Sequence, residues 1–92
     1  MTKETINQVI ELVQEGYGLY TAFKKSNDMN VFDQLTKKLE FVDAMIHACT
    51  KPKYYPTGEG WDLMLVDSPS KDELNPPTRE SLLNWFKARS LA

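Results

Sequence analysis

A chain of 92 residues and 10.6 kDa is long enough for one hydrophobic core and too short for two, so we expect a single domain over residues 1–92. Hydrophobic residues make up 41% and charged residues 26% of the sequence, which is ordinary globular usage and excludes a disordered or fibrous chain. A net charge of −2 is too small to steer a charged partner of either sign.

The first predicted element is an amphipathic helix near the N-terminus. Thr5 and Gln8 have the spacing of a capping box. Apolar residues recur at steps of three and four, as on one face of a helix: Ile6, Val9, Ile10, Val13, Tyr17 and Tyr20. Gly16 and Gly18 each cost a helix about 1 kcal/mol relative to alanine. Because the aromatic residues that follow stay in phase, we expect the helix to continue through both glycines.

A second long helix is predicted after the sequence KKSNDMN at residues 24–30, whose turn-favouring residues interrupt the first helix. Asn30 is a suitable N-cap, and Asp33 complements the positive end of the helix dipole. Steps of three and four give this helix one apolar seam, made of Phe32, Leu35, Leu39, Val42, Ile46 and Cys49. The helix should end before Pro52, because a residue that precedes proline is displaced from the α region.

The sequence WDLMLV at residues 61–66 is compatible with two structures. The alternation of Trp61, Leu63 and Leu65 with their neighbours favours a short strand. A single strand would have no partner in this chain, so a short helical turn docked on the two long helices is the preferred alternative.

The last predicted element is a helix capped by Thr78, after Pro76 and Pro77. Its inner face contains Leu82, Trp85 and Phe86, with Leu91 as a further candidate. Two long helices, a short third element and a C-terminal helix, joined by short connections, predict an all-α fold. This fold is a small antiparallel helical bundle.

Few residues are suited to catalysis or metal binding. The single histidine and single cysteine, His47 and Cys49, point about 200° apart on a helix and cannot form a catalytic pair. We expect His47 to pair with Asp43 on the helix surface and Cys49 to be buried. One histidine and one cysteine cannot hold a structural zinc ion. The sequence therefore predicts no enzymatic activity, no metal and no cofactor.

Location and association are constrained by the apolar residues and the cysteine. The longest apolar run is four or five residues, whereas about 18 are needed to span a bilayer. Cys49 has no partner for an internal disulfide. We expect a soluble cytoplasmic protein that does not enter a membrane. It is a monomer or a homodimer, the latter if the seam of the second helix is not covered within one chain.

The sequence YYPTGEGWDLMLVDS at residues 54–68 concentrates aromatic rings, glycines and carboxylates. One interpretation is that its rings cover the end of a small core, where each buries about 150–250 Å². The other is that they anchor a protein interface with an acidic rim. The candidate partner-binding residues are Tyr54, Tyr55, Glu59, Trp61 and Asp62. Of the three rings, Trp61 is expected to be more buried and the tyrosines more exposed.

A lysine face supports a different hypothesis, a nucleotide or nucleic-acid binding module. Its lysines would contact phosphates while the tyrosines stack on bases. The candidate residues are Lys24, Lys25, Lys37, Lys38, Lys51 and Lys53. Four acidic residues share this segment, and the chain has a pI near 5.3, whereas nucleic-acid modules are usually far more basic. A solvated surface is therefore the preferred interpretation of these lysines.

Two segments resemble the colicin and pyocin nuclease immunity proteins. PTGEGWDLM at residues 56–64 resembles the Gly-x-Asp-Leu-Ile opening of that family's short third helix, and PPTRESLLNWFKAR at residues 76–89 resembles its proline-led last helix. In that family a Tyr-Tyr-Pro follows the Asp-Leu-Ile and carries much of the nuclease contact. Here Tyr54, Tyr55 and Pro56 precede the Gly-x-Asp-Leu instead. The resemblance implies partner contacts by Asp62 and, by proximity, by the tyrosines.

The immunity proteins are small acidic helical bundles that bind and block a bacteriocin nuclease. By resemblance, the leading hypothesis is a non-enzymatic inhibitor or immunity-type module that occludes another protein. Its partner would be a bacteriocin nuclease or a host defence complex. A phage or plasmid accessory protein that inhibits a host defence complex would have the same sequence features as an immunity protein.

Overall fold

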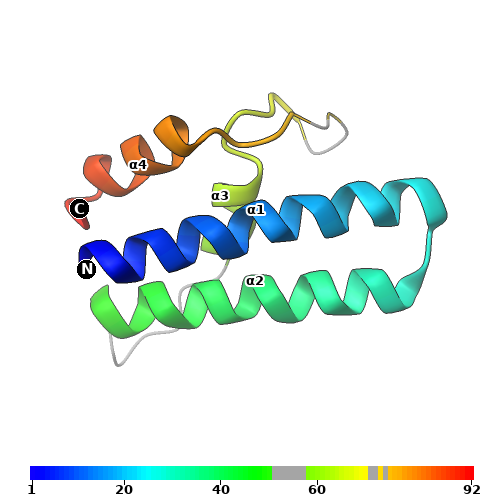
Figure 1. Cartoon of the computed structure of the whole chain (residues 1–92), viewed down its shortest axis with the longest axis horizontal. Coiled ribbons are helices and arrows are strands. Elements are labelled where there is room, and N and C mark those ends of the chain that lie inside the picture. The colour runs from blue at the N-terminus through cyan, green and yellow to red at the C-terminus, as the bar shows by residue number, and fades with distance from the viewer. Residues whose placement is uncertain (51–57, 71–72, 74) are drawn as a thin grey trace.

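The computed structural model describes residues 1–50, 58–70, 73 and 75–92, except for the side chain of Thr50. It contains four helices, α1 (Lys3–Ser26), α2 (Met29–Thr50), α3 (Glu59–Met64) and α4 (Arg79–Ala88), and no strand among the described residues (Figure 1). The predicted all-α fold, with two long helices, a short third and a C-terminal helix, is confirmed. Residues 61–64 lie in α3, so the helical alternative for this segment is correct.

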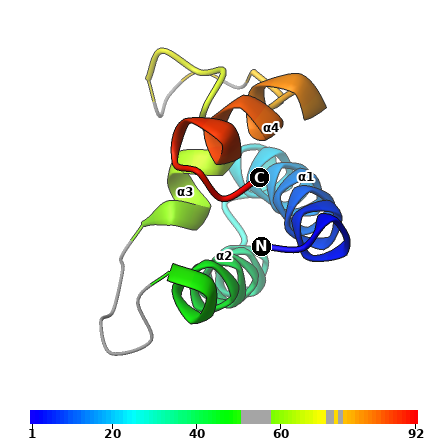
Figure 2. The same cartoon turned by 90° about the vertical axis from the view of Figure 1, so that its left-hand side faces the viewer.

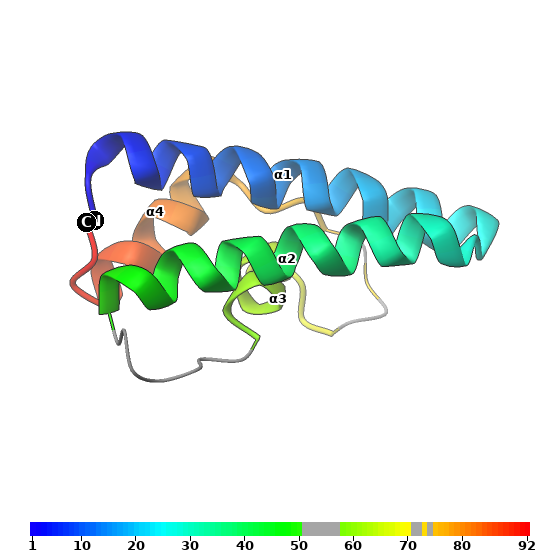
Figure 3. The same cartoon turned by 90° about the horizontal axis from the view of Figure 1, so that it is seen from below.

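The long helices α1 and α2 form an antiparallel hairpin with a very short turn (Figures 1 and 3). Asn27 adopts the left-handed conformation, with φ 55°, and its amide donates to the carbonyl oxygen of Phe23 at 2.7 Å. This arrangement satisfies the end of α1 as an αL cap does. The carboxylate of Asp28 then accepts from the amide of Asn30 at 2.9 Å, which caps α2.

Both long helices begin earlier than the sequence predicted. The N-cap of α2 is Asp28 rather than Asn30. The N-cap of α1 is Thr2, whose hydroxyl accepts from the amide of Thr5 at 3.1 Å, so Thr5 and Gln8 are no capping box. Each helix begins two or three residues earlier than predicted, and the side chain of Thr2 or Asp28 accepts from a free amide of the first turn.

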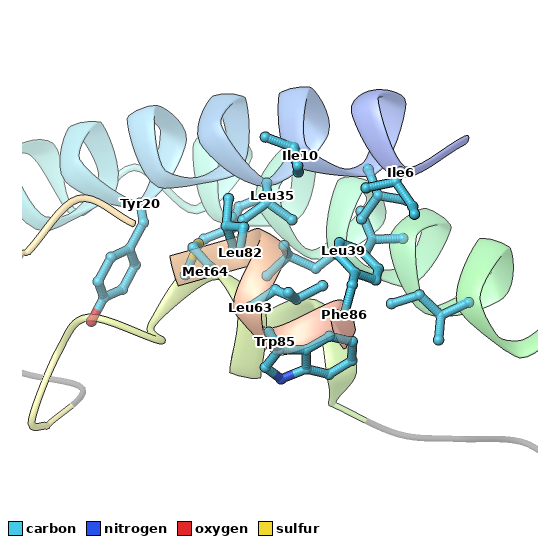
Figure 4. Packing of buried hydrophobic residues seen from close by; sticks show 14 residues of the cluster. Ile6, Ile10, Tyr20, Leu35, Leu39, Leu63, Met64, Leu82, Trp85 and Phe86 are labelled. Carbon is cyan, nitrogen blue, oxygen red and sulfur yellow. The ribbon is translucent and has the colours of Figure 1, made fainter. Parts of the chain in front are cut away.

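The core lies between the hairpin and the two shorter helices (Figure 4). Its fully buried residues include Val9, Val13, Leu35, Leu39, Val42, Leu63, Met64, Leu82 and Phe86. The predicted apolar faces of the two long helices are buried in their central parts, whereas Tyr17 and Phe32 are only half-buried. The predicted burial of Cys49 is wrong, because this residue is exposed in the last turn of α2. It lies almost one turn beyond Ile46, the last buried residue among the described side chains of α2.

The helices α3 and α4 lie on the same side of the hairpin (Figure 2). Three buried side chains attach α4 to the core: Leu82, Trp85 and Phe86. Near the end of α4, the guanidinium of Arg89 lies 3.7 Å from the centre of the Trp85 ring and donates to the Trp85 carbonyl at 3.3 Å. The N-terminus and the C-terminus lie next to each other at one end of the molecule (Figures 1 and 2).

The start of α4 is held by Thr78, as predicted, and by Asp67 from the segment that follows α3. The Thr78 hydroxyl accepts from the amide of Ser81 at 3.1 Å. Asp67 accepts from the Ser81 hydroxyl at 2.5 Å and from the Thr78 amide at 2.7 Å. These bonds, that from Ser81 first, hold the pKa of Asp67 below its ordinary value, because they stabilise the ionised carboxylate.

Asp67 is therefore expected to contribute to the acid sensitivity of the fold. Its pKa in the folded state lies below its ordinary value of 3.8. The ionised carboxylate thus stabilises the fold above that ordinary value, and this stabilisation is lost as the pH falls through the folded-state pKa. We expect the free energy of unfolding to decrease less steeply below pH ~4 in Asp67→Asn than in the native chain. Urea unfolding at several pH values measures this difference, and an equal slope in both proteins would contradict it.

Candidate protein-binding site

The helix α3 begins with backbone groups bound to a carboxylate of α2. Gly58, at the N-cap, has a φ of 92° and no side chain with which to cap the helix. Asp43 supplies this function, because its carboxylate accepts from the amides of Gly58 at 3.3 Å and of Gly60 at 2.5 Å. The negative charge also faces the positive end of the α3 dipole. The pairing of Asp43 with His47 stays a prediction.

Removing this carboxylate should destabilise the protein measurably. We expect Asp43→Ala to lower the free energy of unfolding by about 1–2 kcal/mol, as does the loss of other N-capping side chains. Asp33→Ala is the matched control, because Asp33 is exposed on the same helix and, among the described residues, forms a surface ion pair with Lys37 alone. The control should change stability by no more than about 0.5 kcal/mol. Equal losses in the two variants, measured by urea unfolding, would show that Asp43 does not hold α3.

The backbone of α3 lies directly against α2. A Cβ atom added at the buried Gly60 would lie 2.7 Å from the carbonyl oxygen of Leu39. Glycine is therefore the residue that permits this approach. Leu63 and Met64 on the same short helix are fully buried, whereas Asp62 is exposed. The inner face of α3 thus fixes the direction in which its outer face points.

An aromatic cluster joins α3 to the two long helices. The Trp61 ring lies edge-on to Tyr20 of α1, with ring centres 6.0 Å apart and an interplanar angle of 90°. It is tilted by 38° relative to Phe32 of α2, at 6.4 Å. Such ring pairs add stabilisation beyond the area that they bury. Trp61 is half-buried, so it both packs on the core and keeps a surface that a partner can reach.

A surface pocket of about 820 Å³ lies beside this cluster. We call it the aromatic pocket. Its walls include one ring from each of the four helices and the apolar side chains that follow α3. The described lining residues include Tyr20, Phe32, Trp61, Asp62, Leu65, Val66 and Trp85. Val66 is 37% exposed, which is high for an apolar side chain beside a core. The pocket is concave and mostly apolar, as are sites that bind a side chain or small ligand.

The charge beside the aromatic pocket is negative. Glu59 and Asp62 both lie in the first turn of α3, and no lysine or arginine is among the described residues that line the pocket. The carboxylate oxygen Oε2 of Glu59 is buried and accepts no hydrogen bond from the described residues. The site therefore combines exposed apolar surface with the exposed carboxylate of Asp62, which a cationic group of a partner can approach.

Three of the five predicted partner-binding residues, Glu59, Trp61 and Asp62, are brought together on α3. Tyr54 and Tyr55 lie outside the described residues, so their place relative to the pocket stays a prediction. The contributions of Tyr20, Phe32, Leu65, Val66 and Trp85 to the pocket were not predicted from the sequence. The sequence feature that could have indicated the pocket is that the third helix is much shorter than the two long helices. With a rise of about 1.5 Å per residue, the six residues of α3 cannot cover α1 and α2 to their ends.

The predicted lysine face is only partly described. Lys51 and Lys53 lie outside the described residues, and Lys24 and Lys25 are exposed at the end of α1. The ammonium nitrogen of Lys37 lies 3.1 Å from Asp33, and that of Lys38 lies 2.7 Å from Glu15. Two of these four described lysines are thus paired with carboxylates. The nucleic-acid hypothesis stays a prediction. The two ion pairs leave fewer lysines available for phosphate contacts than the sequence suggested.

The described residues provide no evidence of other kinds of site. No three histidine, cysteine, aspartate or glutamate side chains among them lie close enough together to hold a metal ion. Within the same residues, no helix combines the length and apolar composition needed to cross a membrane. Comparisons with protein-family models, with curated proteins and with solved structures found no significant match to this chain.

Proposed function

We propose that this protein is a small non-enzymatic protein-binding module, which presents α3 and the aromatic pocket to a partner protein and thereby occludes it. The main support is the pocket itself, where rings from all four helices and the exposed Val66 adjoin Asp62. Protein interfaces concentrate aromatic residues at their centre and polar residues at their rim. A few such anchors usually supply most of the binding free energy.

The chemistry of the pocket favours a partner with a basic, partly apolar surface. An apolar side chain of the partner would enter between Trp61 and Val66, and a lysine or arginine would approach Asp62. By resemblance, this partner is a bacteriocin nuclease, which the protein would inhibit as an immunity protein. Inhibition of a host defence complex by a phage or plasmid protein is the alternative target, and it uses the same surface.

Binding to a nucleic acid is less well supported than binding to a protein. Phosphate contacts require free cations, because they replace the counterions of the nucleic acid. Lys37 and Lys38 are paired with carboxylates, and the described residues that line the aromatic pocket include Asp62 and no lysine. Stacking of bases on Trp61 would therefore bring phosphates toward negative charge.

The proposal is tested by affinity capture from a lysate with the tagged native chain and with Asp62→Lys, followed by mass spectrometry. The native chain should retain a protein that Asp62→Lys loses, because the substitution reverses the charge beside the pocket. Glu40→Lys is the matched control, since Glu40 is exposed on α2 and does not line the pocket. This control should retain the same protein. Purified chain should then inhibit the captured protein at a molar ratio near one.

The tyrosine pair can be tested with the same captured protein. If Tyr54 and Tyr55 are hot spots, replacement of both by alanine should weaken binding by more than about 2 kcal/mol while far-UV circular dichroism stays unchanged. Unchanged affinity in this variant would remove the tyrosines from the site. Unchanged affinity in Asp62→Lys as well would contradict the proposed function.

A further inference from the structure

The side of the hairpin that faces away from α3 carries a shallow apolar groove. Figure 2 shows both short helices on one side of α1 and α2, and none of the described helices covers the other side. Two adjoining depressions of about 750 and 360 Å³ lie between the long helices and share Leu12, Glu15 and Phe41. We call this surface the rear groove. Its apolar side chains are Leu12, Leu19, Phe41 and Met45.

Phe41 is the most exposed of these side chains, at 59%. It follows Leu39, which contacts α3, by two positions on α2. At 3.6 residues per turn, the two side chains therefore point about 200° apart. A large ring exposed beside three partly buried apolar side chains forms a contiguous patch, and such patches commonly mark protein interfaces.

Charged residues of opposite sign flank the rear groove on its two helices. The α1 side has Glu11 and Glu15, and the α2 side has Lys37 and Lys38. Lys38 bonds to Glu15 within the chain at 2.7 Å. The pair of Lys37 with Asp33 has side chains that are 73% and 65% exposed, so a partner can still reach them. One edge of the groove is thus acidic and the other basic.

This distribution is self-complementary under a two-fold rotation. The Lys38–Glu15 contact shows that these residues lie at the same height along the hairpin, and Leu12 is then level with Phe41 because the helices are antiparallel. A two-fold axis parallel to the helices preserves height and places α1 of one protomer against α2 of the other. Leu12 then meets Phe41 of the partner subunit, and acidic residues meet lysines. An axis perpendicular to the helices would place like charges together.

We propose that the rear groove binds a second copy of this chain, so that two α1–α2 hairpins form an antiparallel four-helix bundle at the centre of a homodimer. The two Phe41 rings and their apolar neighbours supply the buried surface, and the charged edges fix the relative direction of the hairpins. The dimer leaves α3 and the aromatic pocket on its outer sides. The inference is therefore independent of the proposed function.

Sedimentation equilibrium of the full chain tests the dimer directly. The native protein should have twice the 10.6 kDa mass of one chain at micromolar concentration. Phe41→Lys introduces a charge at the centre of both grooves and should weaken dimerisation by at least about tenfold. Met29→Lys is the matched control, because Met29 is 65% exposed and does not line the groove, and it should leave the dimer unchanged. Far-UV circular dichroism verifies that both variants are folded.

A mixing experiment tests the charged edges. Glu15→Lys and Lys38→Glu should each weaken self-association, because each creates two like-charged contacts across the interface. An equimolar mixture of the two variants should recover the dimer, since the mixed dimer has a lysine opposite a glutamate at both contacts.

Four outcomes would overturn the proposal. These are a monomer at every concentration, a dimer that Phe41→Lys leaves intact, a dimer that Phe41→Lys and Met29→Lys weaken equally, and a mixture of charge variants that stays monomeric. If the chain stays monomeric and a different protein binds the rear groove, the proposed homodimer is equally overturned.

Discussion

Gly60→Ala is expected to lower the free energy of unfolding by about 2–3 kcal/mol, although alanine ordinarily stabilises a helix. The added methyl group would lie 2.7 Å from the Leu39 carbonyl oxygen and 3.1 Å from the Leu39 Cα atom. These are backbone atoms, so the clash cannot be relieved by rotating a side chain. The helix α3 must move away from α2, and the amide bonds to Asp43 must lengthen.

The control for this prediction is Gly18→Ala. A Cβ atom at Gly18, exposed in the middle of α1, would have nothing within 4 Å. This variant should be more stable than the native chain by about 0.5–1 kcal/mol. Urea unfolding of both variants therefore gives effects of opposite sign for the same chemical change. If Gly60→Ala were also stabilising, the close contact between α3 and α2 would be wrong, and with it the placement of Trp61 and Asp62.

Phe86→Ala is expected to have the largest effect, a loss of about 3–5 kcal/mol. The Phe86 side chain is fully buried, and its ring lies edge-on to Trp85 with centres 5.4 Å apart. The ten residues of α4 are fewer than the about 12–15 that an isolated helix needs to be even marginally stable. The helix therefore depends on this packing.

Two measurements separate a general loss of stability from a local loss of α4. Urea unfolding gives the change in free energy, and far-UV circular dichroism of the native state shows whether helical content has decreased. Lys87→Ala is the control, because Lys87 is the exposed neighbour of Phe86 on α4. It should change stability by less than about 0.5 kcal/mol. A similarly small change in Phe86→Ala would mean that α4 does not close the core.

The repeats of apolar residues predicted the fold because burial at steps of three and four leaves few alternatives to packed helices. Leu35, Leu39, Val42 and Ile46 are all buried, as their spacing required. Cys49 continues the same spacing and is nevertheless exposed. Periodicity identifies the side of a helix that faces a neighbour, but the length of the contact depends on where the other elements end.

The helix ends were less predictable, because several polar residues near each end are able to cap. Thr2 and Thr5 are both suitable N-caps by residue type, as are Asp28 and Asn30. The choice between them depends on the geometry of the preceding chain, which in α2 is set by the left-handed Asn27. Residue type alone does not contain this information.

The site was predicted in part because aromatic and acidic residues are close together in the sequence around α3. Trp61 and Asp62 were found in this way. Tyr20 and Phe32 were assigned to helix seams, and they line the aromatic pocket because Trp61 of α3 packs beside both of them. A pocket made by residues from four helices depends on tertiary packing, which local sequence patterns do not specify.

The adjacent termini of this chain bear on its engineering. Met1 and Ala92 lie at the end of the molecule opposite the α1–α2 turn, whereas Tyr20 and Phe32 place the aromatic pocket toward that turn (Figure 1). A short peptide joining the two ends would make a circular backbone, in which new ends can be opened between Asn27 and Asp28. Such a permutant would keep all four helices, and it would carry a fused reporter beside the pocket rather than far from it.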